Sequence, residues 1–235
     1  MKRAVLILVV LGLILCGSWQ ARAAEYAFGF SFYNGNESLI MGLASDGEVS
    51  LNTNGLQGWW SATASNSPGN TNYFVGDLSF DGSALLNDFF TFDISNFAGQ
   101  IAISATLSVT QFDVLSDSGR ASQLYSLYDV STPAGQLDAV GGTNAAIYTD
   151  LGSGNSYGNV SIPVGYSLNP VTIALNGNAL NDINIALSQG QQFFSIGGTV
   201  APSSAPVPEP STWLLLATGG TGLLGYGWRR RQRVA

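Results

Sequence analysis

The chain has 235 residues, of which 46% are hydrophobic and only 10% are charged. Residues 24–212 hold all fifteen Asp and Glu residues but a single base, Arg120, so the chain is strongly acidic between its two ends. It contains no His and one Cys, Cys16, which excludes His-based catalysis, His–metal sites, disulfides and zinc clusters. This charge pattern also excludes a basic face for nucleic acid.

The N-terminal end predicts a secretory signal peptide over residues 1–23. Two basic residues precede an uninterrupted apolar run, residues 4–15. This run is too short to cross a hydrocarbon core of about 30 Å as a retained helix. Ala21 and Ala23 place small side chains at the two positions that precede a signal-peptide cut, so we expect cleavage after Ala23.

Residues 24–200 have the length of one domain, and their apolar residues recur mostly with a period of two. Clusters of Gly, Asn, Asp and Pro separate the alternating segments, as in turns between strands. We expect strands at residues 26–32, 73–80, 89–94, 101–110, 124–130, 160–164, 171–175 and 192–196. The sequence therefore predicts an all-β fold, a single antiparallel β-sandwich of jelly-roll type.

The clearest strand and the only expected helix of this domain have simple patterns. In residues 101–110, Ile101, Ile103 and the three apolar residues at 105, 107 and 109 alternate with small or polar residues. A short helix is expected at residues 178–189, capped by Asn178 and ended by Gly190. Its apolar residues share one face, which is expected to cover one end of the sandwich.

The C-terminal end has three parts in a fixed order. Residues 201–210 form a Pro-rich linker, whose prolines favour an extended backbone. Residues 211–228 contain no charge and predict a single transmembrane helix with a Trp near each interface. Residues 229–235 form a basic tail. By the positive-inside rule we expect its arginines to stop transfer and remain cytoplasmic, namely Arg229, Arg230, Arg231 and Arg233.

This C-terminal order resembles the PEP-CTERM sorting tail of exported proteins from Gram-negative bacteria that make exopolysaccharide. The sorting motif itself is Val207, Pro208, Glu209 and Pro210. The resemblance implies recognition by a membrane-embedded cysteine protease of the exosortase type, with cleavage near Pro208 to Pro210. It also implies export through the inner membrane, single-pass anchoring before processing, and a final location at the cell surface or outside the cell.

Several short sequence segments of residues 24–200 resemble a domain shared by many PEP-CTERM proteins of unknown activity. They are residues 90–95, 125–133, 150–158 and 174–177. The layout is similar to jelly-roll modules of cell-surface and carbohydrate-binding proteins. The resemblance brings no catalytic residues.

Two kinds of ligand site stay open at this level. Trp59 and Trp60 could stack on a glycan, since adjacent strand residues point to opposite faces, although aromatic residues of a sandwich also fill its core. No cofactor is predicted, but a structural calcium ion is left open because turn carboxylates and amides supply oxygen ligands. The candidate ligands are Asp46, Glu48, Asn52 and Asn54, or Asp113 with Asp117.

The sequence thus predicts a non-enzymatic, exported protein of the cell surface or extracellular matrix. We expect a structural or adhesive role in an exopolysaccharide biofilm, with an exosortase-type protease and exopolysaccharide as partners. A carbohydrate-binding module is the alternative. A polysaccharide hydrolase is a further alternative, and it requires two carboxylates about 5–9.5 Å apart across a cleft.

Overall fold

The computed structural model describes residues 25–29 (backbone only), 37–61, 72–78, 84–110, 113–116, 119–138, 144–167 and 169–200. The predicted signal peptide, linker, transmembrane helix and basic tail lie outside these ranges. No helix within them is long and apolar enough to cross a membrane. Residues Ala23–Ser203 form one compact unit.

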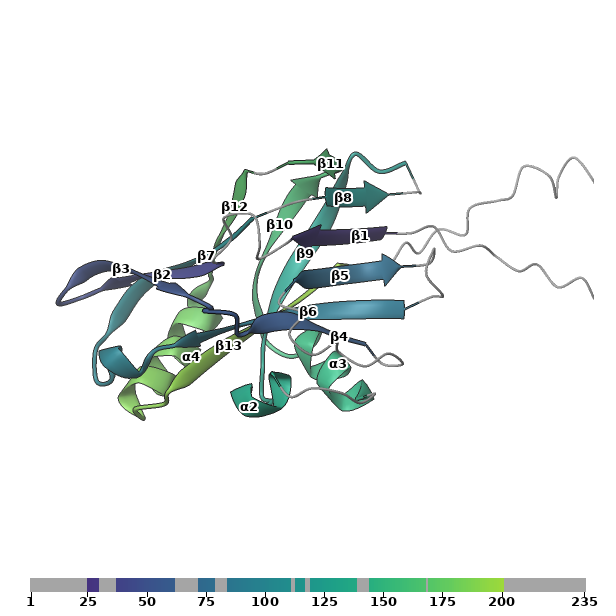
Figure 1. The fold of residues 1–235 in the computed structure, drawn as a ribbon. Coiled ribbons are helices and arrows are strands. Elements are labelled where there is room, and N and C mark those ends of the chain that lie inside the picture. The colour runs from purple at the N-terminus through teal and green to yellow at the C-terminus, as the bar shows by residue number, and fades with distance from the viewer. Residues whose placement is uncertain are drawn as a thin grey trace, which may run out of the picture. The chain divides into compact units, whose positions relative to one another are not determined.

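The described strands form two antiparallel sheets (Figure 1). The larger sheet contains β1 (Glu25–Gly29), β4 (Gln57–Ser61), β5 (Tyr73–Leu78), β6 (Ala84–Asp93), β8 (Asp113–Ser116), β9 (Ser122–Asp129), β10 (Ser156–Pro163), β11 (Gly165–Tyr166) and β13 (Phe193–Val200). Its order is β10-β9-β13-β6-β5-β1-β8-β11, and β4 also pairs with β6. The smaller sheet, in the order β12-β7-β2-β3, contains β2 (Ser38–Leu43), β3 (Gly47–Asn52), β7 (Ala102–Thr110) and β12 (Pro170–Ala174). The antiparallel, predominantly β fold is confirmed, and the jelly-roll order of the strands stays a prediction.

Strand β6 is buried on both faces. Phe90 and Phe92 point into a first core between the two sheets, whereas Phe89 points into a second core on the opposite face. A strand covered on both sides needs a nearly continuous run of large apolar residues, and this segment of β6 provides one.

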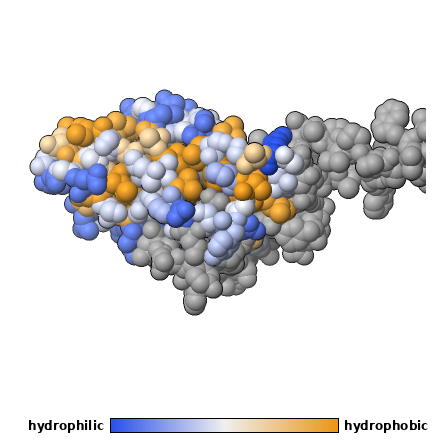
Figure 2. Space-filling model, turned by 90° about the horizontal axis from the view of Figure 1, so that it is seen from above, coloured by the Kyte–Doolittle hydropathy of each residue, from blue (hydrophilic) through white to orange (hydrophobic). Residues whose placement is uncertain are grey.

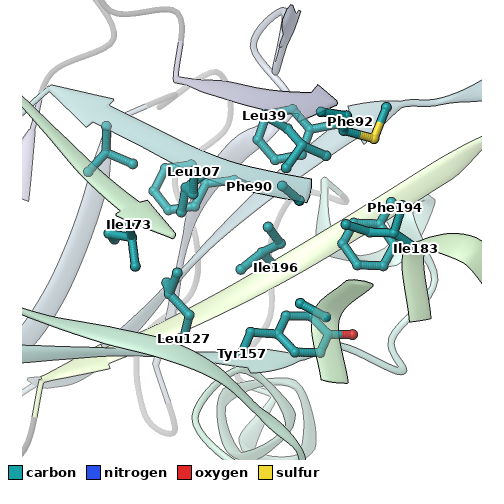
Figure 3. Close-up of a cluster of buried hydrophobic side chains, with 14 of the residues drawn as sticks. Leu39, Phe90, Phe92, Leu107, Leu127, Tyr157, Ile173, Ile183, Phe194 and Ile196 are labelled. Carbon is teal, nitrogen blue, oxygen red and sulfur yellow. The ribbon is translucent and has the colours of Figure 1, made fainter. Parts of the chain in front are cut away.

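The first core joins both sheets and one helix (Figure 3). Leu39 of β2, Leu107 of β7 and Ile196 of β13 are each 0% exposed and pack with Phe90 and Phe92. Burying one such side chain contributes about 1.5–3 kcal/mol, so the packing of these residues between the sheets stabilises the unit.

The second core lies between the larger sheet and two short helices, α2 (Ala134–Leu137) and α3 (Ala145–Leu151), which Figure 1 shows together beside β4 and β6. Phe89 and Trp60 of the sheet pack there against apolar residues of both helices. The Trp60 indole Nε1 donates a hydrogen bond of 2.9 Å to the carbonyl of Leu137. Neither helix was predicted.

The helix predicted at residues 178–189 is present as α4 (Gly177–Ser188). Its cap is Asn176 rather than Asn178, because the Asn176 side chain accepts hydrogen bonds of 2.9 and 3.2 Å from two N–H groups of the first turn. Gly190 follows the helix with φ of 64°, a left-handed conformation that suits Gly at a helix end. The buried face belongs to the first core and consists of Ala179, Ile183, Ala186 and Leu187.

Strand β7 departs from the predicted alternation at its start. Residues from Ala105 onward alternate as expected, but Ile101 and Ile103 are 61% and 63% exposed. The cause is a β-bulge. Gly42 of β2 pairs with Ser104, but the next residue of β2, Leu43, pairs with Ala102, so the register skips one residue of β7. Side chains on either side of a bulge change face, so Ala102 is buried instead of its neighbours.

A side chain of α4 stabilises the bulge. Asn184 accepts a hydrogen bond of 2.8 Å from the N–H of Ala102 and donates one of 2.9 Å to its carbonyl. The amide thus pairs with the backbone as a neighbouring strand would. Figure 2 shows apolar and polar residues interspersed on one face of the described unit.

Gly197→Ala tests the contact between β13 and α3. A Cβ atom at Gly197 would lie 2.8 and 2.9 Å from the Cα and carbonyl carbon of Leu151, which is tighter than real contacts allow. We expect the variant to lose about 1–3 kcal/mol in the free energy of unfolding, measured by urea unfolding with Trp fluorescence.

The matched control is Gly177→Ala, where an added Cβ meets nothing within 4 Å. It should change the free energy of unfolding by no more than about 0.5 kcal/mol. Equal losses in the two variants would contradict the packing of α3 on β13.

Candidate functional site

The link between β9 and α2 is held by one carboxylate. Asp150, in α3, accepts hydrogen bonds of 2.6–3.3 Å from the N–H and hydroxyl groups of Ser131 and Thr132. Partial burial acts to raise the pKa of Asp150, but these hydrogen bonds together outweigh it and hold the pKa below its usual range. The ionised carboxylate therefore fixes this link against α3.

A second carboxylate holds the turn before β10. Asp129, the last residue of β9, accepts a hydrogen bond of 2.6 Å from the N–H of Asn155, and its own N–H donates one of 3.0 Å to the Asn155 carbonyl. Gly154 has φ of 99°, and a Cβ there would overlap the Asp129 carboxylate. Only Gly suits this position.

The start of β10 is joined to α4. The Asn176 side-chain amide donates a hydrogen bond of 2.7 Å to the carbonyl of Ser156. The Tyr157 hydroxyl donates one of 3.0 Å to Asp182 of α4. Burial, and then the contact with Asp182, raises the pKa of Tyr157, so this hydroxyl stays a donor. The two loops and the helix thus have fixed positions relative to each other.

These elements surround a cavity of about 390 Å³. The end of β9, the link to α2, the starts of β10 and β13, and one side of α4 form its walls. Tyr157 and Phe194 form the wall next to the first core, where their rings stack with centroids 6.0 Å apart (Figure 3). Among the residues that the structure describes, no Lys or Arg lines the cavity, and its polar side chains include Asp129, Asn155, Asp182 and Gln191.

A separate pair of acids lies inside the unit. Glu37 precedes β2 and Asp88 lies in β6, and both are 0% exposed. Both oxygens of Asp88 accept hydrogen bonds of 2.9 Å from the Tyr125 hydroxyl. Neither oxygen of Glu37 has a partner of regular hydrogen-bond geometry among the described residues. Neither carboxyl is accessible to a ligand in solution.

Burial controls the ionisation of both acids. It raises the pKa of Glu37 to about 7, and the Glu37 backbone and the Gln57 side chain offset only part of this effect. Burial also raises the pKa of Asp88 well above its usual range, which the Tyr125 hydroxyl only partly offsets. The two acids also repel each other when charged.

The structure separates the two tryptophans predicted as a glycan platform. They point to opposite faces of β4, as expected. Trp60 is only 3% exposed and belongs to the second core, so its predicted role in stacking is wrong. Trp59 is half-buried, with its indole N–H buried and unpartnered, and stacking by Trp59 stays a prediction.

The predicted calcium ligands of the first set do not converge. Asp46 precedes β3 and Asn52 is its last residue, which places their backbones about 20 Å apart at roughly 3.3 Å per residue. Asp113 lies in β8, and Asp117 lies outside the described residues. Within the described part of the chain, no three His, Cys, Asp or Glu side chains gather as metal ligands.

The predicted processing residues all lie outside the described ranges: Ala21, Ala23, Val207, Pro208, Glu209, Pro210, Arg229, Arg230, Arg231 and Arg233. A comparison with protein families matches residues 206–231 to the PEP-CTERM protein-sorting motif. The chain carries this sorting motif. It includes the four motif residues and three of the four arginines. Comparisons with curated proteins and with solved structures find no match.

Sequence reasoning did not identify the cavity residues as a site. Asp129, Tyr157 and Asp182 are far apart in the chain, and no spacing rule connects them. The sequence nevertheless contained a signal for this site. The segments at residues 125–133 and 150–158, which resemble the PEP-CTERM domain, and the helix after 174–177 all contribute to the cavity walls. In the structure their Asp and Asn residues hold the cavity walls together.

The buried acids predict a pH-dependent stability. Glu37 releases its proton near pH 4.5 when unfolded and near pH 7 when folded. The contribution of Glu37 to the free energy of unfolding is therefore fully present below about pH 4.5. It falls by roughly 3 kcal/mol as the pH rises to about 7. Glu37→Gln should be more stable than the wild type at pH 8 and should depend less on pH, in urea unfolding at pH 5 and pH 8.

Glu48→Gln is the control, because Glu48 lies exposed in β3. It should keep the pH dependence of the wild type. If Glu37→Gln follows the same curve as the wild type, Glu37 is ionised in the folded protein at neutral pH.

Proposed function

We propose that the chain is an exported surface or extracellular-matrix protein, anchored in the membrane by its C-terminal end until an exosortase-type protease releases it. The sorting motif at residues 206–231 is the observation that supports this proposal, since the motif implies export and anchoring before processing. The expected signal peptide and the confined positive charge of the two ends agree with it.

The mature unit is proposed to act without catalysis. The chain contains no His, and its only Cys lies in the expected signal peptide. Asp129 and Asp150 accept hydrogen bonds from loop backbone, an arrangement that suits loop positioning. Glu37 and Asp88 are enclosed, which does not suit a general acid or base that must reach a substrate.

The proposed role is structural or adhesive, within a matrix of exopolysaccharide. An excess of carboxylates over bases keeps the protein soluble at high local concentration. The same charge repels anionic polymers unless divalent cations bridge them, so neutral or cationic polymers are the better partners.

Intact-mass analysis of the protein isolated from outside the cell tests the proposal. The mature form should begin at Ala24 and end near Pro208 or Glu209. A variant with Pro208→Ala, Glu209→Ala and Pro210→Ala should keep its C-terminal end and stay in the membrane fraction.

Pro202→Ala is the control, because it changes a linker proline outside the matched motif. It should be processed like the wild type. A mature extracellular protein that still contains Arg229 to Arg233 would contradict processing at the motif.

A further inference from the structure

The cavity between β9, β10, α4 and β13 has an excess of hydrogen-bond acceptors. A carboxylate offers about four lone-pair sites. The structure fills few of them, since Asp129 accepts from the Asn155 N–H, and Asp182 accepts from the Tyr157 hydroxyl and the Asn181 amide. The remaining sites have no partner among the described residues and can accept from a ligand that brings donors.

The donors of the link between β9 and α2, and the Tyr157 hydroxyl, already have acceptors within the protein. The hydroxyl and N–H groups of Ser131 and Thr132 all donate to Asp150. The Tyr157 hydroxyl donates to Asp182, and its pKa is raised by burial and then by the charges of Asp182 and Asp129. A ligand with a carboxylate or phosphate would therefore meet like charge and few donors.

The charge of the site favours a cation. Two carboxylates line the cavity, and none of its described lining residues is a base. The body as a whole offers one Arg against its many acids, so the long-range field has the same sign. Hydrogen bonds between an ammonium group and a carboxylate are roughly twice as strong as neutral ones.

The size and the other walls favour a ligand larger than a bare ammonium ion. The volume of about 390 Å³ falls in the usual range of ligand pockets, about 300–1,000 Å³. The amide of Asn155 can pair with hydroxyl groups, as can that of Gln191, which also donates a hydrogen bond of 2.9 Å to Gln189. The half-buried Phe193 adds an apolar surface for a ring.

We propose that this cavity binds a sugar unit that carries a protonated amine. Asp129 and Asp182 bind the ammonium and the hydroxyl beside it, and Asn155 and Gln191 contact the hydroxyls of the far side. This inference rests on the proposed function, because the polysaccharide around the cell supplies the ligand.

Calorimetric titration of the protein purified from its native host tests the inference, at 0.15 M salt and neutral pH. A trisaccharide of glucosamine should bind, and the N-acetylated trisaccharide should bind at least about tenfold more weakly, because it lacks the charged donor. A trisaccharide of galacturonate should not bind. Putrescine, a linear diamine, should bind at least about tenfold more weakly than the glucosamine trisaccharide.

Asp182→Asn and Asp129→Asn should each weaken binding of the glucosamine trisaccharide at least about tenfold. Asp46→Asn removes the same charge from the turn before β3, away from the cavity, and should bind like the wild type. Circular dichroism and unfolding midpoints of all three variants establish that they are folded. Two cavity variants are used so that a folding defect in one still leaves a test.

Binding that is unchanged in both cavity variants, or reduced equally by Asp46→Asn, would overturn the site. Equal binding of the N-acetylated trisaccharide would show that the site does not recognise the protonated amine. Equal binding of putrescine would show that it does not recognise the sugar. These results do not depend on how the chain is sorted. A failure of C-terminal processing would contradict the proposed function and leave the binding result standing.

Discussion

Carboxylates that have almost no cations to pair with set the constraint on which this protein is built. Residues 24–212 contain fifteen acids and one base, so ion pairs cannot stabilise the acids as they do in most proteins. Each buried or half-buried carboxylate must accept hydrogen bonds from N–H and O–H groups or stay protonated. Asp150 and Asp129 accept hydrogen bonds from backbone N–H groups, whereas burial raises the pKa of Glu37 to about 7.

This constraint explains why the loops around the cavity are ordered. The strands and α4 are stabilised by their apolar side chains in the first core. The link from β9 to α2 and the turn before β10 contain few apolar residues. Asp150 and Asp129 fix them instead, by accepting hydrogen bonds from the backbone. The cavity is consequently formed before any ligand arrives, which lowers the entropic cost of binding. Its carboxylates keep free acceptor sites, and these define the kind of ligand that fits.

Local patterns were sufficient to predict much of the fold. The alternation of Val160 and Ile162 in β10 and of Val171 and Ile173 in β12 with polar residues, and the helical period of α4, identify these elements without knowledge of their partners. Helices α2 and α3 have four and seven residues, too short for a clear period, and they exist because they pack on Trp60 and Phe89. The exposure of Ile101 and Ile103 depends on a bulge that only the pairing with β2 creates.

The same limit applies to the candidate site. The sequence indicates that Trp59 and Trp60 face opposite ways, but the face that is buried depends on two helices that could not be predicted. Asp129 and Asp182 line the same cavity because β10 pairs with β9 and α4 packs on β10, which are contacts between distant segments. The sorting motif, in contrast, is a local sequence signal, and it was predicted in full from its residues.

The most direct test of this account is an NMR titration of the side-chain carboxyl carbons of the folded protein. The account predicts that Asp93, which accepts two hydrogen bonds from Ser95, and Asp150 titrate below their usual range. It predicts that Glu37 titrates near pH 7 and Asp88 well above the usual range for Asp. If all four carboxyls titrated together near pH 4, hydrogen-bond donors and burial would not control their charge, and the account would be contradicted.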